Sequence, residues 1–187
     1  MTFKQADKGK SNPLFSMFKD NEYNVNCPLA VLANELRRRG FNVEAKGFMN
    51  KGWALELSNK PEKAWLSKTG NIPSPKKILG YQRFDKDKGK LVVLSKQMLQ
   101  SEIDELTQTK GRYFIYYKPK KQMGHIICME RNAKNELLFF DPQSGDVLKW
   151  LPEKFKKIDM NFGIHVMRID DLRINPHGLK EVLNVIN

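Results

Sequence analysis

The spacing of hydrophobic residues along the chain predicts a mixture of helices and strands. Apolar residues three or four positions apart predict helices in residues 97–109 and 179–186. The residues that set this spacing are Leu99, Ile103 and Leu106 in the first, and Leu179, Val182, Leu183 and Ile186 in the second. Short apolar runs predict strands in the ranges 41–45, 53–57, 91–94, 113–117, 125–129 and 137–141. This pattern favours an α+β domain.

The runs 125–129 and 137–141 flank a turn-rich stretch and predict a β-hairpin. If the turn centres on Ala133, His125 lies directly opposite Asp141, and both side chains point to one face of the sheet. A carboxylate in that position fixes the tautomer of a histidine and stabilises its cationic form. The alternative is that Asp141 and Pro142 only form the turn that ends a strand. The pairing of His125 with Asp141 therefore depends on the register of the hairpin.

A lone cysteine stands at the start of a further predicted helix. Pro28 suits the first helical position, the arginines at 37–39 suit the last turn, and Gly40 suits the position just beyond it. We therefore expect Cys27 at the N-cap. Free N–H groups and the helix dipole there lower the pKa of a thiol, which is about 8.5 in a free cysteine. The alternative is that Cys27 is a small buried apolar residue that happens to precede a helix.

A cysteine nucleophile needs a base within hydrogen-bond distance, and the chain offers three histidines. His177 lies in a turn signal before the last predicted helix, which places it in solvent. His165 lies in an apolar run, as a core or edge histidine does. His125 opens a strand and has Asp141 as a potential partner, so it is the candidate base.

The order of these motifs resembles the papain-like toxin domains found at the C-termini of bacterial polymorphic toxins and injected effectors. The residues that carry the resemblance are Asn26-Cys27 at a helix start, Gly124-His125 at a strand start, and Asp141-Pro142-Gln143. They lie in residues 26–47 and 111–147. The resemblance implies a papain-like cysteine hydrolase fold, in which the nucleophile helix packs on an antiparallel sheet. It also implies that Cys27 is the nucleophile, His125 the general base and Asp141 the residue that orients the histidine, with Gln143 and Asn26 in supporting positions.

The resemblance implies acyl transfer through a thioester on Cys27. Deamidation of a glutamine side chain in a target protein is the first expectation, and cleavage of a peptide bond uses the same steps. The second is removal of the aminoacyl or peptidyl group from tRNA by the same thiolate. The third is non-enzymatic: a basic RNA-binding or adaptor domain in which Cys27, His125 and Asp141 never meet.

The net charge of +12 and the pI near 9.7 fit either a polyanionic partner or a soluble lysine-coated surface. Lysine outnumbers arginine 25 to 8, and this excess argues against bidentate phosphate recognition, for which arginine is better suited. The sequence does place Lys118, Lys120 and Lys121 just before His125, where a basic loop could guide an acidic protein surface or an RNA backbone. A solvated loop explains the same lysines. No cofactor is expected, and no cysteine and histidine pair has the spacing of a zinc site.

Length and composition favour one domain. The resemblance implies that it is a catalytic domain, which we expect over residues 23–187, with residues 1–22 as a linker or the remnant of a connection to a larger protein. No apolar run is long enough to span a membrane, and no secretory signal begins the chain. With two cysteines, a disulfide framework is not expected. We expect delivery as part of a larger secreted protein, action in the cytoplasm of a target cell, and an acidic immunity protein in the producer.

Overall fold

The computed structural model describes residues 1–16, 21–78, 83–85, 87, 89–92, 95–120, 123–148, 158–159 and 161–186. The helices are α1 (Phe3–Asp7), η1 (Glu22–Asn24), α2 (Cys27–Arg38), α3 (Gly52–Asn59), η2 (Pro61–Ala64), α4 (Lys96–Leu106) and α5 (Leu179–Val182). The strands are β1 (Val43–Ala45), β2 (Trp65–Leu66), β3 (Lys76–Ile78), β4 (Arg83–Asp85), β5 (Lys90–Val92), β6 (Gly111–Tyr117), β7 (His125–Arg131), β8 (Leu137–Asp141), β9 (Asp146–Leu148), β10 (Ile164–Arg168), β11 (Arg173–Ile174) and β12 (Leu183–Val185).

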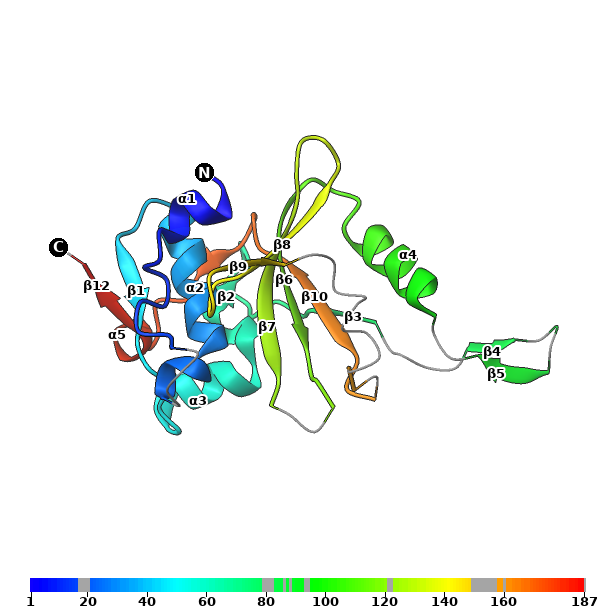
Figure 1. Ribbon diagram of the computed structural model, residues 1–187, viewed down its shortest axis with the longest axis horizontal. Helices are drawn as coiled ribbons and strands as arrows, with labels where there is room; N and C mark the ends of the chain where they lie inside the picture. Colours follow the sequence, from blue (N-terminus) through cyan, green and yellow to red (C-terminus); the bar gives the residue numbers. More distant parts are fainter. Residues whose placement is uncertain are drawn as a thin grey trace.

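Six of the strands form an antiparallel sheet in the order β3-β10-β6-β7-β8-β9. Helices α1, α2 and α3 lie on one side of this sheet and α4 on the other, while the β4–β5 hairpin extends away from the body (Figure 1). The domain is therefore α+β, as the pattern of hydrophobic residues predicts.

The two faces of the sheet bury separate hydrophobic cores, because successive side chains of a strand point in opposite directions. The first core joins α2 and α3 to the residues Phe114, Ile126, Cys128, Phe140 and Met167. The second core joins α4 to the residues Tyr113, Ile115, Ile127, Met129, Phe139 and Val166. Strand β7 contributes to both cores, which fixes the position of its first residue, His125.

Helix α2 is the central element of the first core. Ten consecutive residues from Cys27 to Leu36 are buried, and the helix contacts β1, β7 and α1. It begins one residue earlier than predicted: Asn26 is the N-cap, Cys27 is the first helical residue, and Pro28 follows it. Pro28 is compatible with this start, because the backbone N–H groups in the first turn of a helix have no intrahelical acceptor and proline lacks only that N–H.

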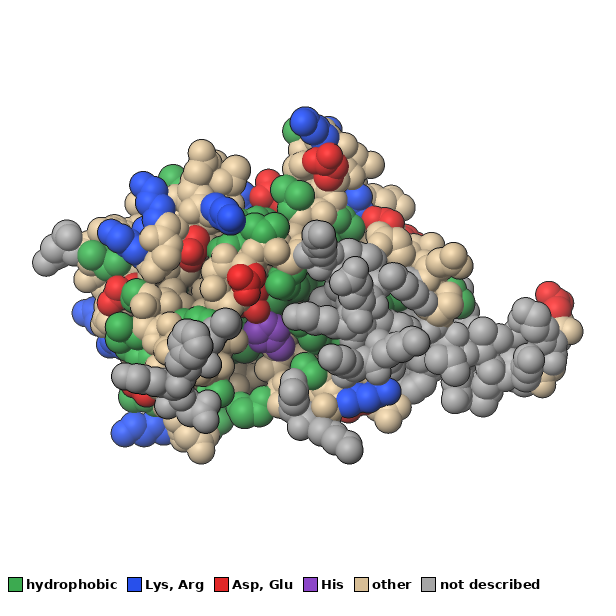
Figure 2. All heavy atoms as spheres, in the orientation of Figure 1, with side chains coloured by type: hydrophobic (Ala, Val, Ile, Leu, Met, Phe, Trp, Pro, Cys, Tyr) green, Lys and Arg blue, Asp and Glu red, His purple; other side chains and the backbone are tan. Residues whose placement is uncertain are grey.

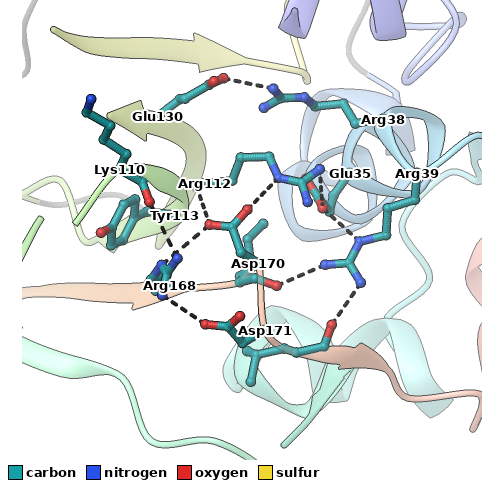
Figure 3. A network of polar contacts seen from close by, with 12 residues as sticks. Glu35, Arg38, Arg39, Lys110, Arg112, Tyr113, Glu130, Arg168, Asp170 and Asp171 are labelled. Carbon is teal, nitrogen blue, oxygen red and sulfur yellow. Dashed lines mark hydrogen bonds and ion pairs between the residues drawn. The ribbon is translucent and has the colours of Figure 1, made fainter. Parts of the chain in front are cut away.

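A network of charged residues fixes the C-terminal half of α2 over one end of the sheet (Figure 3). The buried Glu35 carboxylate pairs with Arg39 at 2.8 Å and with Arg112 of β6 at 3.0 Å. Arg112 also pairs with Asp170, 3.0 Å away, in the loop after β10. Burial raises the pKa of Glu35, although the hydrogen bond from Arg39 and the charge of Arg112 act in the opposite direction. The network therefore links α2 to β6 and to the loop after β10.

The hairpin β7–β8 has a different register from the predicted one. Met129 pairs with Phe139, and Arg131 pairs with Leu137, so the turn centres on Lys134 and not on Ala133. The cause is the turn itself, in which Asn135 adopts a left-handed conformation with φ of 65° and the Asn132 N–H bonds to the Glu136 carbonyl. The shift is two residues, so every side chain keeps its predicted face.

Other expected elements have mixed outcomes. The predicted helix at 97–109 is α4, with Leu99 and Ile103 fully buried, and the strand at 113–117 is β6, paired with β7. The strand expected at 53–57 is wrong, because these residues lie in helix α3. The helix expected at 179–186 ends at Val182, and the chain continues as β12, which pairs with β1. Part of the expected strand 91–94 lies outside the described residues.

The N-terminal segment contacts the rest of the domain over residues 1–16. Phe3 is buried and its ring stacks on Phe140 with centroids 5.5 Å apart. The Arg37 side chain of α2 donates to the Ala6 carbonyl at 2.6 Å. This part of the expected linker is thus packed on α2; the division into linker and catalytic domain stays a prediction.

Candidate functional site

Cys27 lies at the N-terminal end of α2 and is 6% exposed. Its thiol donates to the Gly124 carbonyl at 3.9 Å, so it faces the residue immediately before β7. The N–H groups of Leu29 and Ala30 bond to the Asn26 carbonyl, and Pro28 has no N–H. Among the described residues none accepts a hydrogen bond from the Cys27 N–H, which therefore remains available at the positive end of the helix dipole.

His125 and Asp141 form the second part of the site. The ring Nε2 of His125 lies 2.8 Å from the Asp141 Oδ2, although the two residues sit diagonally and not directly opposite in the hairpin. Long side chains can reach diagonal neighbours on the same face of a sheet, so His125 still contacts Asp141 despite the register shift. The bond to Asp141 occupies Nε2, so Nδ1 is the ring nitrogen that Asp141 does not occupy.

The pKa of His125 reflects both neighbours. Burial alone lowers the pKa of the imidazole, but the interactions with Asp141 and Cys27 outweigh burial, and the pKa rises to about 10. At neutral pH His125 is therefore an imidazolium. Tyr117 lies opposite His125 on β6, and its ring makes an edge contact with the imidazole at a centroid distance of 5.8 Å.

Gly124 has a steric role beside the site. A Cβ on this residue would overlap the ring of Tyr116, which packs directly against the Gly124 backbone. The close approach of Tyr116 requires glycine here, and it keeps the Gly124 carbonyl beside the Cys27 thiol. Burial and the nearby Cys27 both raise the pKa of Tyr116.

A cavity of about 1430 Å³ opens at these residues, lined in part by Cys27, His125, Tyr117 and Gln143. Lys118 and Lys120 also line it and are exposed, whereas Lys121 lies outside the described residues. Figure 2 shows a histidine side chain beside an acidic one near the middle of this face, and the basic side chains of the described residues are scattered over it. The volume is large enough for a segment of a macromolecule.

Asn26 and Gln143 are both buried beside this centre. The Gln143 N–H donates to the Asp141 Oδ1 at 3.0 Å, which leaves Asp141 Oδ2 for the histidine. The Asn26 side chain donates to the Lys46 carbonyl at 2.9 Å. Gln143 Nε2 and Asn26 Oδ1 have no hydrogen-bond partner among the residues that the structure describes. Gln143 thus orients Asp141 through its backbone.

The remaining histidines and the second cysteine lie apart from the Cys27 thiol. His177 is exposed in the turn before α5. His165 is half-buried in β10 and stacks on Phe162 with centroids 5.0 Å apart, and burial lowers its pKa. Cys128 is buried in the first core, where burial raises its pKa, and both cysteines are free thiols.

The sequence interpretation missed Asn12 and Tyr117. In the sequence, Tyr117 lies in an apolar strand and carries no motif that separates it from its neighbours. The pairing of β6 with β7 places it opposite His125. Asn12 lies in a polar segment without a motif, and it reaches the site only through tertiary contacts with Asn26 and Gln143. No signal in a single sequence identifies it.

Within the described part of the chain, no helix has the length and apolar content needed to cross a membrane. The same residues contain no group of three or more histidine, cysteine, aspartate or glutamate side chains placed to hold a metal ion.

Comparison with known proteins finds no matching family model, no matching curated protein and no matching solved structure.

Proposed function

We propose that this domain is a papain-like cysteine hydrolase that acts as a toxin on a macromolecule of a target cell. The observation that carries the proposal is that Cys27, at a helix N-terminus, and His125 line one cavity, with Asp141 bonded to His125. Thiol acyl transfer requires a nucleophile, a base that contacts it and a third group that orients the base.

Deamidation of a glutamine side chain in a protein is the proposed reaction. The Cys27 thiolate attacks the carboxamide carbon, and the Cys27 N–H donates to the oxyanion. His125 gives its proton to the leaving nitrogen, so ammonia departs and a thioester remains. His125 then takes a proton from water, which attacks the thioester and releases glutamate and the cysteine. The net change is one water consumed and one ammonia released.

The alternative is deacylation of aminoacyl- or peptidyl-tRNA by the same residues. Lys118 and Lys120 at the cavity support it, because exposed lysines attract a phosphate backbone. A salt-dependent gel shift with tRNA separates this reaction from action on a protein. If the domain neither hydrolyses an acyl group nor needs Cys27, a basic RNA-binding or adaptor function replaces both.

The biological setting that we propose is delivery within a larger secreted protein, action in the cytoplasm of the target cell, and neutralisation in the producer by an acidic immunity protein. The charge of +12 favours an acidic inhibitor, because opposite charges accelerate association.

The test is expression in a bacterium followed by mass spectrometry of the proteome and of tRNA charging. Cys27→Ala and His125→Ala should each abolish toxicity, because nucleophile and base act as a unit. Cys128→Ala is the matched control, since it removes the other buried thiol, whose side chain points to the face of β7 opposite that of His125, and it should remain toxic if it folds. Full toxicity of Cys27→Ala would refute the enzymatic proposal.

A further inference from the structure

Asn12 connects the two halves of the candidate site. It lies in the N-terminal segment, 14 residues before Asn26 and 131 residues before Gln143, and it is 8% exposed. Its Oδ1 accepts a hydrogen bond from the Asn26 side chain at 2.9 Å, and its Nδ2 donates to the Gln143 carbonyl at 3.0 Å. Asn26 precedes the nucleophile, and Gln143 holds Asp141 through its backbone N–H.

The Asn12 amide also donates to the Tyr23 carbonyl of η1 at 2.9 Å. Both N–H bonds of the amide and one lone pair of its oxygen are therefore used, which leaves this buried side chain with one defined orientation. A single side chain thus connects η1, the residue before α2 and the turn after β8.

We propose that Asn12 is a positioning residue that sets the distance between Cys27 and the His125–Asp141 pair. This inference rests on the proposed function. The bond to Asn26 fixes the first turn of α2, and the bond to Gln143 fixes the turn that carries Asp141. No other described side chain hydrogen-bonds to both of these residues. The N-terminal segment is in this way a part of the catalytic apparatus, although it supplies no reacting atom.

The test is the pH dependence of Cys27 alkylation by iodoacetamide, followed on the Cys27 peptide by mass spectrometry. A cysteine thiol placed beside an imidazolium reacts faster at low pH than an isolated thiol does, so looser positioning should slow alkylation at pH 6 more than at pH 9. For Asn12→Ala we expect the ratio of the rates at pH 6 and pH 9 to fall by about 10-fold, since small misplacements of reacting groups have effects of this order or larger. An unchanged ratio in the folded variant would overturn the proposal.

Ser11→Ala is the matched control. Ser11 is the adjacent residue and is fully buried, and its hydroxyl accepts from Asn34 of α2 at 3.2 Å without contacting the Gln143 turn. This variant should keep the wild-type ratio. An equal fall in Ser11→Ala would mean that any loosening of the N-terminal segment disturbs Cys27, and the specific role of Asn12 would be wrong.

Asn12→Asp provides a second measurement if Asn12→Ala does not fold. The aspartate keeps an oxygen that accepts from the Asn26 side chain, but it has no N–H to donate to the Gln143 carbonyl. The ratio of the alkylation rates at pH 6 and pH 9 should therefore again fall. A wild-type ratio in this variant would show that the Gln143 bond does not position the site. Alkylation also separates the two proposals: a domain without hydrolase activity whose ratio still falls in Asn12→Ala would refute the proposed function while supporting the role of Asn12.

Discussion

Replacing Asp141 with asparagine should lower the pKa of His125 by about one to two units. The His125 Nε2 and the Asp141 Oδ2 lie 2.8 Å apart, and the aspartate side chain is 10% exposed, so the bond is short and poorly solvated. A hydrogen bond to a charged group contributes about 1.5 to 3 kcal/mol, and one pKa unit corresponds to about 1.4 kcal/mol. Asparagine keeps the shape of the side chain but removes the charge that stabilises the imidazolium.

The assay is an NMR titration of the His125 ring, assigned by comparison with the spectrum of His125→Ala. Asp146→Asn is the matched control, because Asp146 pairs with Asp141 in the neighbouring strand and is exposed. This control should leave the titration of His125 at the wild-type value. An unchanged His125 titration in Asp141→Asn would refute the reasoning that Asp141 raises the pKa of the histidine.

The same shift affects stability as a function of pH. The pKa of His125 rises from its ordinary 6.5 to about 10 in the folded protein, so the folded state binds this proton more tightly than the unfolded state. The contribution of His125 to the free energy of unfolding is complete below pH 6.5 and is lost as the pH rises through 10. In Asp141→Asn the loss should begin near the same pH but be smaller in total and finish at lower pH, as measured by urea unfolding between pH 6 and pH 10.

Three further predictions concern the scaffold and the partner. Leu32→Ala should lower the free energy of unfolding by about 2 to 5 kcal/mol because Leu32 is 1% exposed, whereas Val185→Ala, at a position 79% exposed, should change it by less than about 0.5 kcal/mol in urea titrations. Glu35→Ala should cost about 3 kcal/mol, since Arg39 and Arg112 lose a buried counter-charge; the exposed Glu105→Ala serves as its control, and equal midpoints in urea would count against the network. The association rate with an acidic immunity protein should fall steeply as salt rises, and a flat dependence in stopped-flow measurements would argue against electrostatic steering.

The sequence was sufficient to predict the features that depend on local periodicity and capping. Pro28 and the arginines of the last turn indicate the helix that begins at Cys27, and the apolar spacing predicts β6, β7 and α4. The face shared by His125 and Asp141 was also predictable, because side chains alternate with period two and a register shift of two residues preserves the face.

Tertiary structure decided what local patterns leave open. Residues 53–57 carry apolar positions compatible with a strand, but they fold as α3, where Trp53 and Leu57 are buried in the first core. Residues after Val182 continue the helical spacing, yet pairing with β1 extends them into β12. The approach of Cys27 to His125 and the bond from Asn12 to Gln143 join residues more than 90 positions apart, and such contacts form only when α2 packs on the sheet and the N-terminal segment packs against both.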